Sequence, residues 1–157
     1  MLPNMLRLNS LILLLAGAIW AIAPAHGADG RIIKVLPHLL DKEGRHTPAP
    51  SLYERDAYQA WLRKHPDEVS SLRFDVQWKS PVKSPDLKLR LEVRGTKLDL
   101  NKALVIEQPL KKSWRLSQWS ALSLTREQFQ AAGEVISWRA SLWEGATFVA
   151  EQKSFLW

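Results

Sequence analysis

The sequence predicts a mainly β protein: an antiparallel two-sheet sandwich with one helix at about residues 52–64 and a short helical crossover at about residues 126–132. Several short runs alternate apolar and polar residues, which is typical of strands with one buried face and one face in water. Prolines and glycines punctuate the chain between these runs and stop any longer element. Helix-start signals occur at two places, before each expected helix. Short strands separated by turn signals favour a sandwich.

The N-terminal segment, residues 1–27, is predicted to be a secretory signal peptide. Arg7 precedes the apolar run of residues 11–23, and small residues follow it. This is the order of a basic region, an apolar region and a cleavage site. We expect cleavage after Gly27, with cleavage after Ala25 or retention as an anchor as the alternatives. The run is shorter than the roughly 20 residues that a membrane span needs. We therefore expect an exported protein, periplasmic or extracellular, with no membrane span after cleavage.

Residues 28–157 are expected to form a single β-sandwich domain. An N-terminal edge strand and a helix occupy residues 28–68, and the main sandwich strands occupy residues 69–157. Of the 22 basic residues only Arg7 lies in the signal segment, so 21 basic and 16 acidic residues remain, a formal charge of +5. A basic cytoplasmic protein would suggest nucleic acid as a partner. Export would separate the protein from nucleic acid, so anionic material of the cell envelope remains as the candidate partner.

Cysteine is absent. A disulfide framework and a thiolate metal site are therefore excluded, and stability must come from packing. Seven of the eight tryptophans lie after the signal segment. Each can bury a large apolar area, so the sequence predicts a core rich in aromatic residues.

The first elements of the domain are an edge strand and a helix. Residues 31–41 are predicted to be an edge strand interrupted at Pro37, because proline cannot donate to a ladder. Ser51 and Glu54 have capping-box spacing and Pro66 stops the helix of residues 52–64. Its apolar stripe is predicted to consist of Tyr53, Ala57, Ala60 and Trp61.

Two strands with strict alternation follow, at residues 72–79 and 87–94. A proline-containing loop joins them. Their inward residues are predicted to be Leu72, Phe74, Val76 and Trp78 in the first, and Leu87, Leu89, Leu91 and Val93 in the second. Basic residues dominate the outward side of both, so the sequence predicts a positive outer face formed by Lys79, Lys88, Arg90 and Arg94, with Lys111, Lys112 and Arg115 nearby.

The later elements are two strands and a short helix. Residues 103–110 are predicted to be a strand, and residues 113–125 a long or bulged strand with a bend near Gln118. Thr125 and Gln128 form a capping-box pattern, after which the chain can make about two helical turns before a glycine.

The C-terminal residues are predicted to form a hairpin around residues 144–146. Pairing Trp143 with Thr147, Leu142 with Phe148 and Arg139 with Glu151 would put apolar pairs inward and opposite charges outward. In this interpretation Phe155 and Trp157 belong to the last strand and pack against the sheet.

This series of strands is similar to an immunoglobulin-like or fibronectin type III-like sandwich over about residues 31–157, if the first helix is treated as an insertion. Trp78 on an early strand resembles the buried tryptophan of such folds, but the Cys, Trp, Cys spacing of antibody domains is missing. The resemblance is one of architecture and implies no activity.

No motif for chemistry is found. HExxH and GxSxG are absent, and the paired carboxylates are neighbours in sequence, which cannot face each other across a cleft. We therefore predict that the protein is not an enzyme and carries no cofactor. His38 and His46 can converge across a turn and, with Asp41, reach a divalent ion, but ordinary surface histidines are the favoured explanation, and no metal site is predicted.

Aromatic residues are the candidate binding residues: Tyr53, Tyr58, Trp61, Trp119 and Trp143. Exposed aromatics can stack on sugar rings or anchor a partner. The alternative is that the helix closes an open end of the sandwich and Trp143 packs under a loop. The positive outer face would favour anionic ligands.

The function predicted from these patterns is a non-catalytic interaction or accessory module of the cell envelope, with an envelope protein or an anionic glycan as partner. The oligomeric state does not follow from the sequence. One alternative is a small outer-membrane β-barrel, which alternating strands also suit, although the helix and the small number of runs disfavour it. A secreted enzyme with an unrecognised site is the other.

Overall fold

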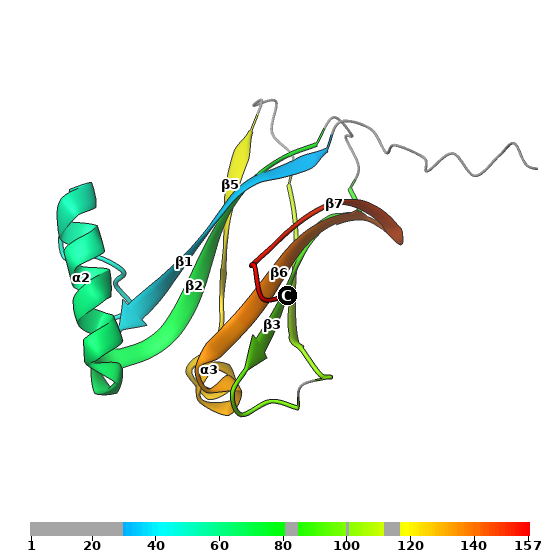
Figure 1. Ribbon diagram of the computed structural model, residues 1–157. Coiled ribbons are helices and arrows are strands. Elements are labelled where there is room, and N and C mark those ends of the chain that lie inside the picture. Colours follow the sequence, from blue (N-terminus) through cyan, green and yellow to red (C-terminus); the bar gives the residue numbers. More distant parts are fainter. Residues whose placement is uncertain (1–29, 81–84, 100, 112–116) are drawn as a thin grey trace, which may run out of the picture.

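The computed structural model describes residues 30–80, 85–99, 101–111 and 117–157, so the predicted signal peptide lies outside it. The described chain forms two antiparallel sheets and two α-helices, which confirms the predicted mainly β, two-sheet fold (Figure 1). The three-stranded sheet has the order β1 (Arg31–Asp41), β2 (Val69–Lys79), β5 (Gln118–Ser123). The four-stranded sheet has the order β4 (Leu104–Pro109), β3 (Leu87–Gly95), β6 (Val135–Glu144), β7 (Thr147–Lys153).

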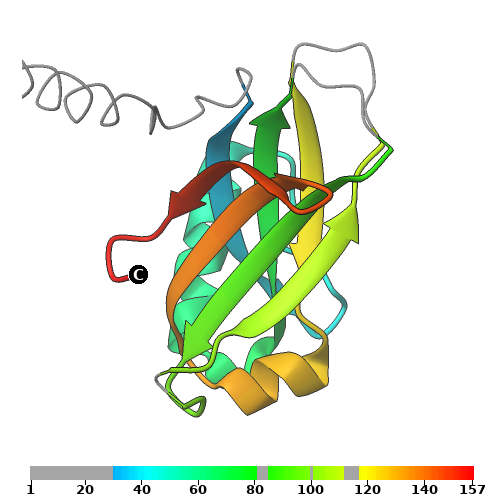
Figure 2. The ribbon, with the colours of Figure 1, turned by 90° about the vertical axis from the view of Figure 1, so that its right-hand side faces the viewer.

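The two sheets face each other (Figure 2). The hydrophobic core consists of buried residues from both of them. Every inward residue predicted for β2 and β3 is buried, which confirms the alternation in both strands. Trp78 has 1% of its surface exposed, and its indole N–H donates to Ser120 Oγ on β5 at 2.9 Å.

β1 is an edge strand as predicted, but it is not interrupted at Pro37. It pairs with β2 on both sides of the proline, with Pro37 opposite Phe74. Backbone groups two residues apart point the same way in a strand. Leu39 directs its N–H and C=O away from β2, toward the side chain of Gln59, so the missing N–H of Pro37 would also have pointed to the free edge. The proline therefore costs the sheet no hydrogen bond.

Both predicted helices are confirmed: α2 (Leu52–Lys64) and α3 (Arg126–Ala132). Ser51 Oγ accepts from the Glu54 N–H at 3.4 Å, and the capping box at Thr125 and Gln128 is complete. α2 and the 3₁₀ turn η1 (Pro66–Glu68) occupy the connection between β1 and β2, whereas α3 crosses from one sheet to the other (Figure 1). No helix in the described ranges is long and apolar enough to cross a membrane.

The predicted register of the last hairpin was wrong. Glu144 pairs with Thr147 and Trp143 with Phe148, so the turn has two residues instead of three. Gly145 takes a positive φ of 57° at the first turn position, as a type II′ turn requires. An irregularity between Leu142 and Trp143 then shifts the remaining pairs.

The last residues also differ from the prediction. β7 ends at Lys153, and Phe155 is fully exposed. Trp157 does pack on the four-stranded sheet, but through the guanidinium groups of Arg94 and Arg139, which lie 4.1 and 4.9 Å from its ring. The first part of the predicted 113–125 strand lies outside the described residues, and the strand observed there begins at Gln118.

Candidate functional site

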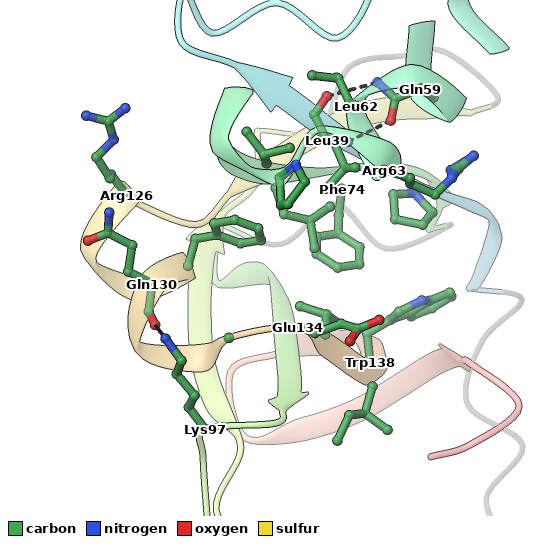
Figure 3. A pocket seen from close by; sticks show the side chains of 18 of the residues that line it. Leu39, Gln59, Leu62, Arg63, Phe74, Lys97, Arg126, Gln130, Glu134 and Trp138 are labelled. Carbon is green, nitrogen blue, oxygen red and sulfur yellow. Dashed lines mark hydrogen bonds between the residues drawn. The ribbon is translucent and has the colours of Figure 1, made fainter. Parts of the chain in front are cut away.

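A groove of about 1100 Å³ lies between the two sheets, at the end that carries the helices. The sheets draw apart toward this end in Figure 1. In Figure 3, Leu39, Gln59, Leu62 and Phe74 line one side of the groove and Trp138 lies on the facing side. The volume is slightly above the range of about 300 to 1,000 Å³ that is usual for small-molecule sites.

The floor of the groove is formed by apolar residues of both sheets. Phe74 and Leu72 come from β2, Leu39 from β1, and Trp138 from β6. The rings of Phe74 and Trp138 meet edge to face, with their centroids 6.0 Å apart. Ile136 also lines the groove, at the point where the pairing of β6 with β3 shifts, and 43% of its surface is exposed. The groove is therefore open to solvent at Ile136, whereas Phe74 and Leu72 are buried at its base.

The helices line the groove without closing it. From α2 only Gln59 and Leu62 are buried, and both line the groove. From α3, which has seven residues, Phe129 lies at the floor and Arg126 and Gln130 at the margin. Because α3 is short, it reaches only one end of the gap between the sheets.

The rim carries both signs of charge. Arg63, Lys97 and Arg126 are basic, and Asp67 and Glu134 are acidic. None of the five takes part in an ion pair within the described chain. The rim thus has a formal charge of +1 and cations that are available to a ligand.

The five aromatic residues predicted to bind a partner do not line this groove, and the structure brings only two of them together. Tyr53, 84% exposed, and Trp61 lie on the outward side of α2, so the predicted apolar stripe faces solvent. Trp119, 52% exposed, is on β5 opposite Gln77. Trp143 is on β6, edge-on to Phe148 with its indole N–H on Ser141 Oγ.

Of these five, Tyr58 and Trp61 are the pair in contact. Their rings stack with centroids 5.6 Å apart, and Trp61 stacks in turn on His65 at 4.4 Å. The Tyr58 hydroxyl donates to Asp41 Oδ2 at 2.7 Å. Tyr58 is therefore tied to the end of β1, and its place on the helix has a structural explanation.

His38 and His46 do converge, as the sequence suggested, with ring centroids 5.2 Å apart. Asp41 does not join them. Its carboxylate accepts from the backbone N–H groups of Glu43 and Arg45, from Arg45 Nε and from Tyr58. Burial opposes ionisation of Asp41, but these hydrogen bonds outweigh it and lower its pKa. The residue closes the turn after β1.

The position that a metal would need beside the two histidines is held by Arg73. Its Nη2 lies 3.2 Å from His46 Nδ1 and 2.9 Å from Asp75 Oδ2. His38 Nε2 lies 3.6 Å from the same Asp75 oxygen. Across the residues that the structure describes, no group of three potential ligands suits a metal ion. A guanidinium in this position leaves no room for a second cation.

We expect the protein to lose stability as the pH falls below about 6.5. Burial lowers the pKa of His38 most, against the opposing effect of Asp75, and burial followed by Arg73 lowers that of His46. Since both pKa values are lower in the folded chain than the ordinary 6.5, the unfolded chain binds more protons in this range. The measurement is the urea midpoint between pH 8 and pH 5.

The double variant His38→Gln with His46→Gln should flatten this pH dependence, while His65→Gln, outside the cluster, should leave it. A midpoint that stays constant in the parent protein over this range would contradict the prediction. The carboxyl of Asp41 does not interfere, because its ordinary pKa already lies below this pH range and the fold lowers that pKa further.

The outer face of the four-stranded sheet is less positive than the sequence suggested. Glu92 is buried between Arg139, whose Nε lies 2.7 Å away, and Arg90 at 3.6 Å. Lys88 pairs with Glu107 at 3.1 Å. Arg94 is covered by Trp157. The predicted positive face is therefore not formed as one surface: Lys88 and Arg90 of β3 are paired, Lys79 lies on β2 in the other sheet, and Lys112 and Arg115 lie outside the described residues.

Comparison of the chain with protein-family models, with curated proteins and with solved structures found no match. The groove is therefore the feature of the molecule that bears on its function. It was not predicted from the sequence, because the residues around Trp138 and Phe129 do not indicate that these two side chains line a groove. Their exposure depends on how far the two sheets diverge.

Proposed function

We propose that this chain is an exported, non-catalytic interaction module of the cell envelope that binds an extended apolar chain in the inter-sheet groove. The observation that supports this most directly is the groove itself, which is lined by apolar residues of both sheets on a two-sheet scaffold. Export is supported by the signal-peptide pattern of residues 1–27.

A non-catalytic role is supported by the residues that line the groove. No histidine is among them, and the Ser154 hydroxyl accepts a hydrogen bond from the Trp138 N–H at 3.0 Å. The carboxylates of Asp67 and Glu134 are both on the rim, in η1 and after α3. A nucleophile beside a base, which acyl transfer would need, is not found among these residues.

An apolar ligand fits the geometry better than an anionic glycan. A sugar platform would need exposed aromatics on one surface. Of the three aromatics on α2, Trp61 is stacked between Tyr58 and His65 and the Tyr58 hydroxyl is bonded to Asp41, while Trp119 and Trp143 lie apart from them on β5 and β6.

On β3, Lys88 and Arg90 are paired and Arg94 stacks on Trp157, so the outer face offers a polyanion few cations. The groove offers apolar side chains of both sheets, and burial of such surface drives association.

The test is binding of an uncharged apolar fluorophore, N-phenyl-1-naphthylamine, to the purified protein. We expect saturable binding that Ile136→Glu weakens by about tenfold, because a carboxylate at the mouth would have to be desolvated. Ile33→Glu is the matched control: Ile33 is exposed to a similar degree, 38%, but lies on β1 away from the groove.

Equal loss of binding in the two variants would mean either that the fluorophore binds elsewhere or that both variants are unfolded. Circular dichroism distinguishes these two cases. No saturable binding to the parent protein would refute the proposed function.

A further inference from the structure

We propose that the ligand of the groove is a single-chain amphiphile with an anionic head group, of the fatty-acid type. Its chain would lie on the apolar floor, and its head would lie beside Arg126 and Lys97. This inference rests on the proposed function and specifies the substrate class of the same site.

The walls of the groove exclude a peptide that adds as a strand to β1. Strand addition needs a row of free backbone N–H and C=O groups at the edge. Leu39 is the edge residue at the groove, and both of its backbone groups are bonded to the side chain of Gln59. Gln59 Oε1 accepts from the Leu39 N–H at 2.8 Å, and Gln59 Nε2 donates to the Leu39 carbonyl at 2.9 Å. The next edge position toward the N-terminus is Pro37, which has no N–H.

The side-chain amide of Gln59 thus takes the place of a neighbouring strand. It is held firmly, because Nε2 also donates to the His46 carbonyl at 2.8 Å and the residue is buried. A ligand in the groove must therefore be recognised through apolar contact with the floor, without a backbone ladder. A hydrocarbon chain meets this requirement, since it brings no polar groups that would be left unpaired.

The charges of the rim place the head group. Arg126, Gln130 and Lys97 lie along one side of the groove, next to α3, in Figure 3. Lys97 Nζ lies 3.5 Å from the Gln130 carbonyl oxygen, and within the described residues no carboxylate pairs with it. Of the two acidic rim residues, Asp67 lies in η1, between α2 and β2, and Glu134 follows α3. The α3 side thus carries two cations against one carboxylate, which favours a carboxylate or phosphate head that accepts from the ammonium and the guanidinium.

The experiment is displacement of N-phenyl-1-naphthylamine at pH 8 by three amphiphiles with the same twelve-carbon chain, each kept below its micelle-forming concentration. The anionic member is dodecanoate, the uncharged one 1-dodecanol and the cationic one dodecylammonium. We expect dodecanoate to displace the fluorophore at about tenfold lower concentration than dodecanol, and dodecylammonium to be the weakest.

The double variant Arg126→Gln with Lys97→Gln should remove the preference for dodecanoate and leave the affinity for dodecanol unchanged. Lys102→Gln is the control, because Lys102 is an exposed lysine away from the groove. Equal displacement by dodecanoate and dodecanol in the parent, or a preference that survives the double variant, would overturn the inference and leave the proposed function standing. Failure of the fluorophore itself to bind would refute both.

Discussion

Trp78→Ala is expected to lower the free energy of unfolding by about 3 to 5 kcal/mol. Trp78 lies near the end of β2, within the core, with 1% of its surface exposed. Its removal would leave a cavity that the flanking strands cannot close, because Phe74 and Val76 are part of the same rigid ladder. The Ser120 hydroxyl would also lose its indole donor. Urea denaturation followed by circular dichroism measures the change.

Trp119→Ala is the matched control for this prediction. Trp119 lies on the neighbouring strand β5, with half of its surface in water, so its loss should cost less than about 1 kcal/mol. If Trp78→Ala also cost less than about 1 kcal/mol, the inward face of β2 would be misassigned.

The strands and helices could be predicted because their signals are local. Phe74 and Trp78 alternate with polar residues. On a sheet with one buried face, such a strand is stable only when its apolar side chains point to the core. Thr125 and Gln128 satisfy each other's backbone within a single turn, so the start of α3 follows from four residues.

The orientation of α2 could not be predicted, because it depends on residues far apart in the chain. The sequence pattern left open whether Tyr53 and Trp61 face a partner or the core; in the structure the helix turns Gln59 and Leu62 inward. The reason is the free edge of β1: Leu39, twenty residues earlier, has two backbone groups that Gln59 satisfies. The periodicity of the helix sequence does not indicate that a distant strand has backbone groups to be hydrogen-bonded.

The groove was missed for a related reason. Whether Trp138 is covered depends on the divergence of two sheets, which the alternation within each sheet does not specify. The hairpin register was missed because a turn of two or three residues suits the same apolar pattern, and Gly145 decides between them through its positive φ.

Gly95→Ala is expected to cost about 3 kcal/mol of unfolding free energy, at the upper end of the usual cost of overpacking. Gly95 ends β3 directly beneath the C-terminus of α3. A β carbon there would lie 2.1 Å from the Ala132 carbonyl oxygen and 2.8 Å from its carbon. Both are backbone atoms, and the carbonyl is already held by the Lys97 N–H at 3.0 Å. The end of α3 would therefore have to move.

Gly145→Ala separates this clash from the general cost of replacing a glycine. Gly145 has a positive φ but open space around it, so the change should cost about 1 to 2 kcal/mol of backbone strain. The two variants should also differ at the groove, because Gly133 and Glu134, which follow α3, line it. Displacement of α3 should weaken binding of N-phenyl-1-naphthylamine in Gly95→Ala and leave it unchanged in Gly145→Ala. Unfolding free energies that fall equally, with binding intact in both, would show that α3 adjusts without moving the groove.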